Sequence, residues 1–177
     1  TFAEGLEPAE SYYFRFIAPD GSISDIGRTR TLPEGPADRF RMAVFSCANI
    51  GFGWFNAYAH AAADGNFDCV LHLGDYFYEY APGTYPSTDE TVSGRSVWPS
   101  HELVALADYR ERYAAYRQDP DLRRLHQLFP MIAVWDDHES ANDSWEGGAE
   151  NHQPDSEGEW SVRKAAAMKA YREWRPV

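Results

Sequence analysis

The chain has 177 residues, of which 44% are hydrophobic and 15% aromatic, and its formal net charge is −12. This composition excludes a disordered segment and allows one domain with a substantial core, or one domain with part of a second. The charge disfavours a nucleic-acid backbone or an anionic membrane surface as partner, and it suits anionic substrates only where bound cations reverse the local field. No apolar run has transmembrane length. No signal peptide is visible and the first residue is not Met, so we expect a mature or trimmed product.

Residues 1–32 have the pattern of antiparallel strands. Aromatic side chains alternate from Tyr12 to Phe16, Pro19-Asp20-Gly21 is a turn sequence, and residues 22–31 predict a return strand. Two strands are marginally stable alone. We therefore predict the C-terminal strands of a small β-sandwich domain, with a β-ribbon that packs on the main domain as the alternative. Residues 33–38 are the predicted linker.

From residue 39 the pattern changes to α/β. Strands are predicted at 40–46, 67–74 and 131–135, and helices at 55–63, at 101–117 with Ser100 as N-cap, from Asp119-Pro120 onward, and up to Trp174 after a capping box of Ser156 and Glu159. The intervening residues 81–99 predict a long loop, and such loops are usually functional.

Each predicted strand ends in side chains that can bind a metal. The first strand runs into Cys47, the second into Asp75 with Tyr78 three residues later, and the third into residues 136–139, Asp-Asp-His-Glu. In open α/β folds the carboxyl ends of the strands form the ligand-binding edge of the sheet. The sequence therefore predicts a hydrolase metal site at this edge.

The chemistry of these side chains favours a transition metal together with hard cations. Asp75 is the strongest candidate because a carboxylate can bridge two cations, although a helix N-cap or a surface acid is the alternative. Phenolate from Tyr78 suits a strongly acidic ion such as Fe(III), and a packed aromatic is the alternative. A thiolate at Cys47 also favours a transition metal over an all-Mg site, with a small buried core residue as the alternative.

The third strand end adds candidate catalytic groups. Adjacent acids repel one another unless a cation neutralises them, so Asp137 is a predicted metal ligand, with a solvated acidic loop as the alternative. His138 is predicted to donate a proton or to hold a phosphate oxygen, and Glu139 to fix its imidazole by hydrogen bonding. Asn142 is a weaker candidate ligand. We predict that His72, inside the second strand, is a core histidine.

The two cysteines are predicted to be unpaired. Cys47 closes one strand whereas Cys69 opens its neighbour, so in a parallel sheet they lie at opposite edges, too far apart to bridge. We assign Cys69 to the core. The other histidines, His60, His101, His126 and His152, are predicted to be surface or helix residues.

Three segments together resemble the alkaline phosphatase D (PhoD) family of calcineurin-like metallophosphatases: residues 45–47 (Phe-Ser-Cys), 72–79 (His-Leu-Gly-Asp-Tyr-Phe-Tyr-Glu) and 135–139 (Trp-Asp-Asp-His-Glu). The Gly-Asp-x-x-Tyr pattern also resembles purple acid phosphatases, while the Cys and the Asp-Asp-His-Glu are more specific to PhoD. The resemblance implies a metallophosphatase β-sandwich with flanking helices, of the α-β-β-α type. Residues 39–177 would be the N-terminal portion of that catalytic domain, and residues 1–32 the end of a fibronectin-like domain.

The resemblance also implies a site drawn from all three strand ends. The implied metal ligands are Cys47 and Tyr78 on Fe(III), Asp75 between the iron and Ca(II), and Asp137, with Asp136 and Asn142 as further candidates. The implied catalytic residues are His138 and Asp137. Another divalent metal is the alternative to iron and calcium.

Family members hydrolyse phosphomonoesters and phosphodiesters, some act as phospholipase D, and they are typically exported. We therefore expect a secreted or periplasmic hydrolase whose substrate is a small phosphoester or a phospholipid head group. The family's remaining ligands, including an Asp-x-His motif, lie beyond this stretch, so we expect the C-terminal part of the same enzyme as partner. The alternatives are a phospholipase D whose aromatic-rich loop, Tyr76 to Trp98, contacts lipid, and a non-catalytic metal-binding module.

Overall fold

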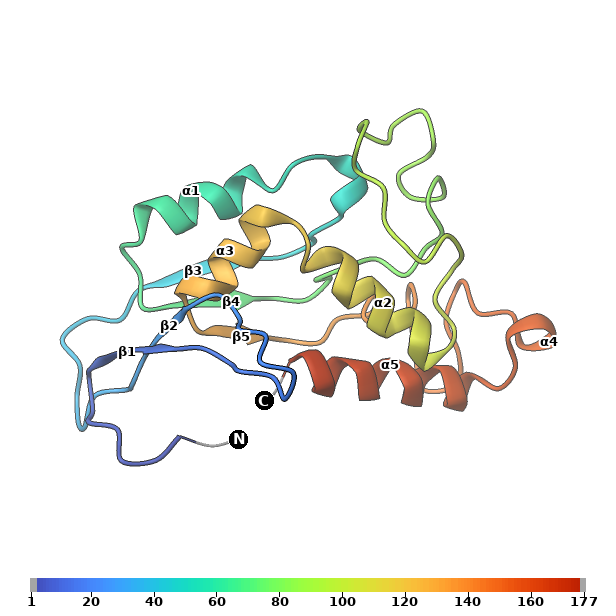
Figure 1. The fold of residues 1–177 in the computed structure, drawn as a ribbon. Helices are drawn as coiled ribbons and strands as arrows, with labels where there is room; N and C mark the ends of the chain where they lie inside the picture. The colour runs from blue at the N-terminus through green and yellow to red at the C-terminus, as the bar shows by residue number, and fades with distance from the viewer. Residues whose placement is uncertain (1–2, 176–177) are drawn as a thin grey trace.

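The computed structural model describes residues 3–175, which form a β-hairpin followed by a small parallel sheet with helices (Figure 1). In chain order the elements are β1 (Ser11–Phe14), β2 (Gly27–Arg30), β3 (Met42–Phe45), the 3-10 helix η1 (Ile50–Phe52), α1 (Asn56–Asp64), β4 (Cys69–His72), α2 (Leu106–Tyr116), α3 (Pro120–Leu128), β5 (Met131–Ala133), α4 (Pro154–Glu157) and α5 (Trp160–Trp174). Among these residues no helix is both long and apolar enough to cross a membrane.

The parallel sheet has the strand order β3-β4-β5. Met42 lies opposite Cys69, and Val70 lies opposite Met131, so the three strands run side by side in one direction. Their carboxyl ends consequently meet at one edge, as the α/β pattern predicted. Cys69 is buried at the far edge and Cys47 is exposed at the near one, and both thiols are free, which confirms the prediction of no disulfide.

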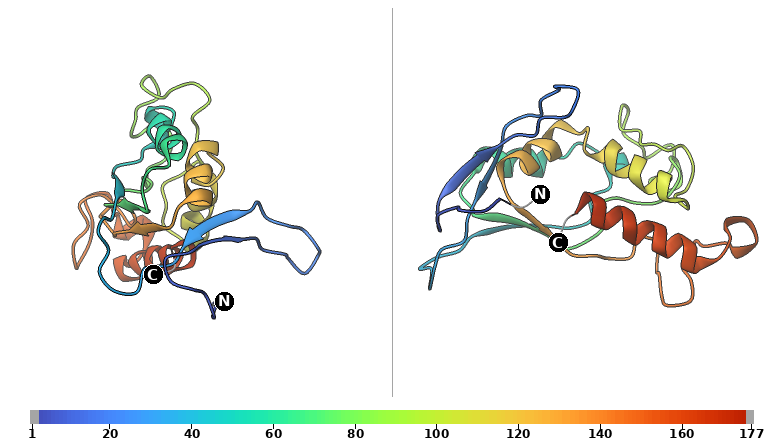
Figure 2. Two further views of the ribbon diagram at one scale, coloured as in Figure 1. Left: turned by 90° about the vertical axis from the view of Figure 1, so that its left-hand side faces the viewer. Right: turned by 60° about the horizontal axis from the view of Figure 1, so that its bottom comes forward.

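One face of the sheet is covered by the helices, and the other face is apolar but open. The core joins side chains of β4, α1, α2, α3 and α5, and it is rich in tyrosine. Figures 1 and 2 show α1 and α3 above the strands, with α5 running below α2. The opposite face carries the exposed apolar residues Met42, Val44, Leu73, Ile132 and Val134. Alternation along each strand explains this division, because successive side chains point to opposite faces.

The start of α2 differs from the prediction. The helix begins at Leu106, not at residue 101, and Ser100 does not cap it. Instead the carboxylate of Asp108 accepts hydrogen bonds from the backbone N–H groups of Val104 (3.0 Å) and Ala105 (2.7 Å). These bonds satisfy donors that an α-helix leaves free at its N-terminus, and so they fix the first turn.

The last helix also begins differently. Gly158, with φ +83°, separates the short α4 from α5. Glu159 is the N-cap residue of α5, and its side chain makes no capping hydrogen bond. The predicted capping box of Ser156 and Glu159 is therefore wrong. By contrast, the carboxylate of Asp119 caps α3 as predicted, accepting from the N–H groups of Asp121 and Leu122.

The N-terminal hairpin packs on the end of α3. β1 and β2 are antiparallel, and the return strand is shorter than predicted. Arg28 donates from Nε to the carbonyl of Leu128 (3.0 Å), and its guanidinium lies 4.8 Å from the centre of the Phe129 ring. Gln127 donates to the carbonyl of Ile26 (2.7 Å). That the hairpin belongs to a larger β-sandwich domain stays a prediction.

Candidate metal centre

The ends of β3 and β4 bring Cys47 and Asp75 together. The N–H of Cys47 donates to the carbonyl of Gly74 (3.1 Å), and the N–H of Ala48 donates to that of Asp75 (2.8 Å). Both Cys47 and Asp75 have left-handed backbone conformations, with φ of 56° and 51°. As a result the thiol of Cys47 lies 3.5 Å from Oδ2 of Asp75. Such conformations are uncommon for residues other than glycine and are concentrated at functional sites.

Glu139 joins the end of β4 to the end of β5. Its buried carboxylate accepts hydrogen bonds from the N–H groups of Tyr76 (2.7 Å), Asp136 (2.9 Å) and Asp75 (3.2 Å). Burial raises the pKa of Glu139, and the bonds from Tyr76 and Asp136 partly oppose this shift. The two segments come so close that a Cβ on Gly74 would stand 2.4 Å from Cβ of Asp136. Glycine is therefore required at the turn before Asp75.

Glu79, not Glu139, orients the imidazole of His138. Oε2 of Glu79 lies 2.7 Å from Nδ1 of His138, and Oε1 accepts from the N–H of Asn142 (2.6 Å) and from Nδ2 of Asn151 (2.7 Å). The prediction for Glu139 is wrong because its carboxylate binds the backbone of the strand ends. Sequence reasoning left Glu79 without a role, although it lies next to Tyr78 in the Gly-Asp-x-x-Tyr segment.

The pKa of His138 is raised in this environment. Burial of the ring lowers the pKa, but the hydrogen bond and the charge of Glu79 together with the charges of Asp75 and Asp137 outweigh it. The other ring nitrogen, Nε2, makes no hydrogen bond within residues 3–175. The imidazole is therefore held by one nitrogen and has the other available for chemistry.

Asp75, Asp137 and His138 form a cluster suited to a cation. Each offers one ligand atom, and these atoms all lie within 4.8 Å of one another. Oδ1 of Asp75 is buried and has no hydrogen-bond partner among the described residues. Burial raises the pKa of Asp75, and the neighbouring Asp136 and Asp137 add to this effect while His138 opposes it. An unpartnered buried carboxylate oxygen beside a second acid fits a metal ion, which would satisfy it.

Tyr78 completes the surroundings of Asp75. Its hydroxyl donates to Oδ2 of Asp75 (3.3 Å), and its ring centre lies 4.2 Å from that of His138. Burial raises the pKa of the phenol, and the charges of Asp75 and Cys47 raise it further. Phenolate at this position therefore requires a strongly acidic cation beside it.

Two predicted ligands make other contacts. Asp136 is exposed, and its Oδ1 accepts from the N–H of Asp137 (3.0 Å). The side chain of Asn142 donates to Glu150 (3.2 Å), while its backbone N–H binds Glu79.

His72 is buried in β4 as predicted, with Nε2 3.2 Å from the hydroxyl of Tyr58.

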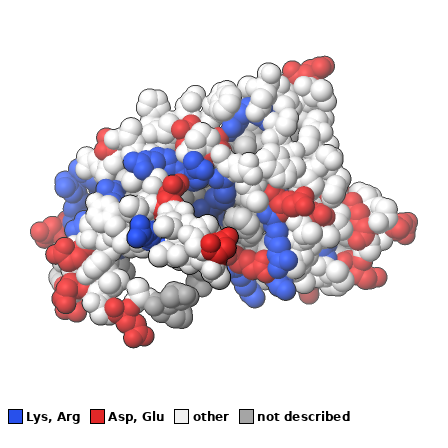
Figure 3. All heavy atoms as spheres, viewed as in Figure 1, with Lys and Arg blue, Asp and Glu red and all other residues white. Residues whose placement is uncertain are grey.

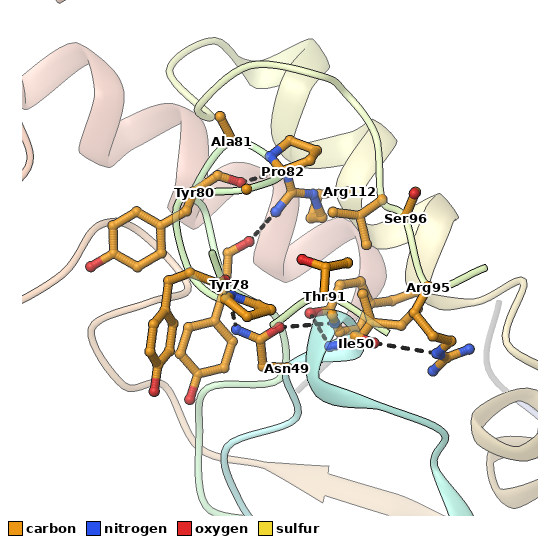
Figure 4. Close-up of a pocket in the computed structure, with 16 residues that line it drawn as sticks. Asn49, Ile50, Tyr78, Tyr80, Ala81, Pro82, Thr91, Arg95, Ser96 and Arg112 are labelled. Carbon is orange, nitrogen blue, oxygen red and sulfur yellow. Dashed lines mark hydrogen bonds between the residues drawn. The ribbon is translucent and has the colours of Figure 1, made fainter. Parts of the chain in front are cut away.

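A small pocket next to the cluster is lined by Tyr78, whose hydroxyl donates to Asp75. Figure 4 shows this pocket, of about 40 Å³, between the loop of residues 81–97 and the segment from Asn49 to Gly51. Arg112 of α2 fixes the loop by donating to the carbonyls of Tyr78, Tyr80 (3.0 Å) and Trp98 (3.0 Å). In the segment that we predicted to contact lipid, Tyr76, Phe77 and Tyr78 are buried, whereas Tyr85 and Trp98 are about half exposed.

A family model described as PhoD-like phosphatase matches residues 42–177. The chain belongs to the PhoD-like phosphatase family. Alkaline phosphatase D of Bacillus subtilis (strain 168) is 40% identical over 177 residues, which are 99% of this chain and 29% of that protein. The solved structure of PhoD has a TM-score of 0.83 and 38% identity, covering 98% of this chain and 32% of the other. The chain therefore spans about a third of the length of these relatives.

These matches confirm two predictions from the sequence. The PhoD family assignment is correct, and the fold is of the metallophosphatase α/β class, since this PhoD-like phosphatase chain superposes on PhoD over nearly its whole length. The individual ligand roles of Cys47, Asp75, Tyr78 and Asp137 stay predictions, as does the catalytic role of His138.

Proposed function

We propose that the protein is a metal-dependent phosphoester hydrolase. The observation that carries the proposal is the meeting of Asp75, Asp137 and His138 at the carboxyl edge of the sheet, with one buried oxygen of Asp75 lacking a partner. The family and the name of the relative, alkaline phosphatase D, support the same reaction class. Phosphomonoesters, phosphodiesters and phospholipids are the candidate substrates.

The residues of the cluster divide into ligands and a proton donor. Asp75 and Asp137 would hold the metal, which would neutralise charge on the phosphoryl group and lower the pKa of a water so that it can lose a proton and attack as hydroxide. His138, held at Nδ1 by Glu79, can present Nε2 to the leaving oxygen and donate a proton to it. The hydrogen bond and the charge of Glu79 favour the protonated form of His138.

We further propose that one cation is Fe(III), with Ca(II) beside it. Support comes from the donors around Oδ2 of Asp75: the thiol of Cys47 at 3.5 Å and the phenol of Tyr78 at 3.3 Å. Thiolate is a soft ligand and phenolate suits a strongly acidic ion, whereas carboxylates suit Ca(II). Another divalent metal at this position is the alternative.

Metal content and turnover on one sample test both proposals. We expect iron by elemental analysis, a broad visible absorption band from phenolate on Fe(III), and hydrolysis of p-nitrophenyl phosphate that chelation abolishes. Bis-p-nitrophenyl phosphate and phosphatidylcholine, assayed in parallel, rank monoester, diester and lipid substrates. Full turnover in a metal-free sample would contradict metal dependence, and a metal without the band would contradict the iron assignment at Tyr78.

Glu79→Gln is expected to lower metal-dependent turnover by about 10- to 100-fold, the usual effect of losing a residue that orients a group at a metal centre. Gln keeps the size of the side chain but removes the carboxylate that raises the pKa of His138 and fixes its ring. Steady-state kinetics measures the loss. Glu111→Gln, on an exposed position of α2, removes the same charge and should leave turnover unchanged. Equal turnover in both variants would show that Glu79 does not act through His138.

We also propose that further residues of a longer chain pack on the open face of the sheet. Support comes from the exposed apolar residues of that face, which are Met42, Val44, Leu73, Ile132 and Val134. In addition, the chain spans only about a third of the length of its relatives. A non-catalytic module is the alternative for the 177-residue chain by itself. Assaying this chain and a protein of the relatives' full length side by side separates the two functions. Export to the periplasm or beyond stays a prediction.

A further inference from the structure

A second pocket lies away from the candidate metal centre, among the hairpin, the end of α3, β5 and the end of α5. It has a volume of about 200 Å³. Its lining includes three arginines and one histidine, Arg28, Arg117, Arg175 and His126, and no Asp or Glu. The rest of the lining is Phe14, Thr29, Phe129, Pro130, Met131, Ala133 and Trp174. On the face shown in Figure 3, blue Lys and Arg side chains gather around a hollow near the middle, next to the position of α3 in Figure 1.

Arg175 is buried in this pocket, and two of its guanidinium nitrogens lack a hydrogen-bond partner among the described residues. The residue is only 5% exposed, and neither Nε nor Nη2 has a hydrogen-bond partner among residues 3–175. Its Nη1 contacts only the sulfur of Met131 (3.0 Å), and its guanidinium lies 3.5 Å from the centre of the Tyr76 ring. A buried guanidinium without an acceptor is costly, and arginine forks match oxyanions in geometry.

The other two arginines of the pocket also lack an acid. Nη2 of Arg117 has one long bond, 3.4 Å to the carbonyl of Trp174, and Nε is buried without a partner. Arg28 donates from Nε to a backbone carbonyl. Within residues 3–175, none of the three arginines forms an ion pair with a carboxylate, although other arginines of this acidic chain do.

The local field is accordingly positive. Burial lowers the pKa of His126 well below its ordinary value, and the charges of Arg117 and Arg175 lower it further. In the neighbouring core, burial and Arg175 lower the pKa of His72 to about 4. Burial is the larger cause of both low pKa values, and the arginine charges add to it, as expected beside guanidinium groups that no carboxylate pairs.

We propose that this pocket binds a small tetrahedral oxyanion, inorganic phosphate or sulfate, between the guanidinium groups of Arg28, Arg117 and Arg175. The pocket shares no residue with the cluster of Asp75, Asp137 and His138, so the proposal does not depend on the function of that cluster. The same chemistry would recognise the phosphate of an anionic lipid. The volume of the pocket, about 200 Å³, suits a free ion.

Equilibrium dialysis of radiolabelled inorganic phosphate tests the proposal on protein stripped of metal with a chelator, at constant ionic strength. We expect one saturable site per chain. Arg117→Gln and Arg28→Gln should each weaken binding by about tenfold or more, because each removes a charge-assisted hydrogen bond. Two variants are used because Arg117 also contacts α5. Arg123→Gln is the matched control, since it removes the same charge from an exposed position on α3.

The outcomes separate the alternatives. Retained binding in Asp75→Asn together with loss in the two pocket variants supports the proposal. Absence of a saturable site, or equal weakening in Arg123→Gln, overturns it, and so does loss in Asp75→Asn, which would place the phosphate at the metal centre. Sedimentation with phosphatidic acid vesicles, without binding of free phosphate, would overturn the free-ion assignment and identify a lipid site.

Discussion

Asp75→Asn is expected to lower turnover by more than about 10³-fold and to reduce bound metal in the same proportion. The carboxylate of Asp75 has one oxygen beside Cys47 and Tyr78 and another that is buried without a partner. The amide keeps the shape but loses the negative charge that holds a cation. A cation stabilises a phosphoryl transition state by several kcal/mol, and each 1.36 kcal/mol changes the rate about tenfold.

Elemental analysis and steady-state kinetics on the same preparation measure this effect. The control is Asp89→Asn, which removes the same charge at an exposed position of the 81–99 loop. That variant should match the unsubstituted protein in metal content and in turnover. If the Asp75→Asn protein lost its metal but kept full activity, the assignment of Asp75 to the reaction would be wrong.

Gly74→Ala is expected to destabilise the fold by about 4 kcal/mol, from backbone strain and overpacking together. Gly74 has φ +105°, a conformation that L side chains rarely adopt. An added Cβ would also stand 2.4 Å from Cβ of Asp136 and 3.1 Å from its backbone nitrogen, neither of which can move without separating β4 from β5. A loss of this size is a large part of the stability of an ordinary domain. Urea denaturation measures it.

Gly94→Ala distinguishes the two causes. Gly94 also has a positive φ, +81°, but an added Cβ there would meet nothing within 4 Å. We expect this variant to lose only about 1 kcal/mol, the cost of backbone strain without a clash. Equal destabilisation in the two variants would show that the close approach of the strand ends does not matter.

The sequence located the three parallel strands because the physical pattern there is local, although the strands end one or two residues earlier than predicted, at Phe45, His72 and Ala133. An apolar run that stops at a glycine or at an acid marks the edge of a buried parallel strand, and three such runs place their last residues at one edge. This reasoning made Cys47, Asp75 and Asp137 candidate ligands, and the structure places Sγ of Cys47 3.5 Å from Oδ2 of Asp75.

The partner of His138 was not predictable by the same reasoning. Glu139 is adjacent in sequence, but three N–H groups at the strand ends bind its carboxylate. Glu79, 59 positions from His138, takes the place beside the imidazole. The start of α2 was also not predictable from the local pattern. Ser100 is a residue type that commonly caps helices, but the cap is the carboxylate of Asp108, which lies within the first turn of the helix. In both places, contacts in the folded protein determine which acidic or hydroxyl side chain makes the hydrogen bond, and the local sequence pattern does not contain this information.

The left-handed backbone at Asp75 has a consequence for natural variation. Aspartate and asparagine both tolerate φ 51° better than most residues other than glycine, so asparagine is compatible with the backbone at position 75. Asparagine would also remove a buried charge. Selection for thermal stability alone would therefore accept Asn at this position, and only selection for catalysis would retain the acid. Under the proposed role of Asp75 as a metal ligand, natural sequences of this fold that carry Asn here are expected to be stable proteins without metal-dependent hydrolysis.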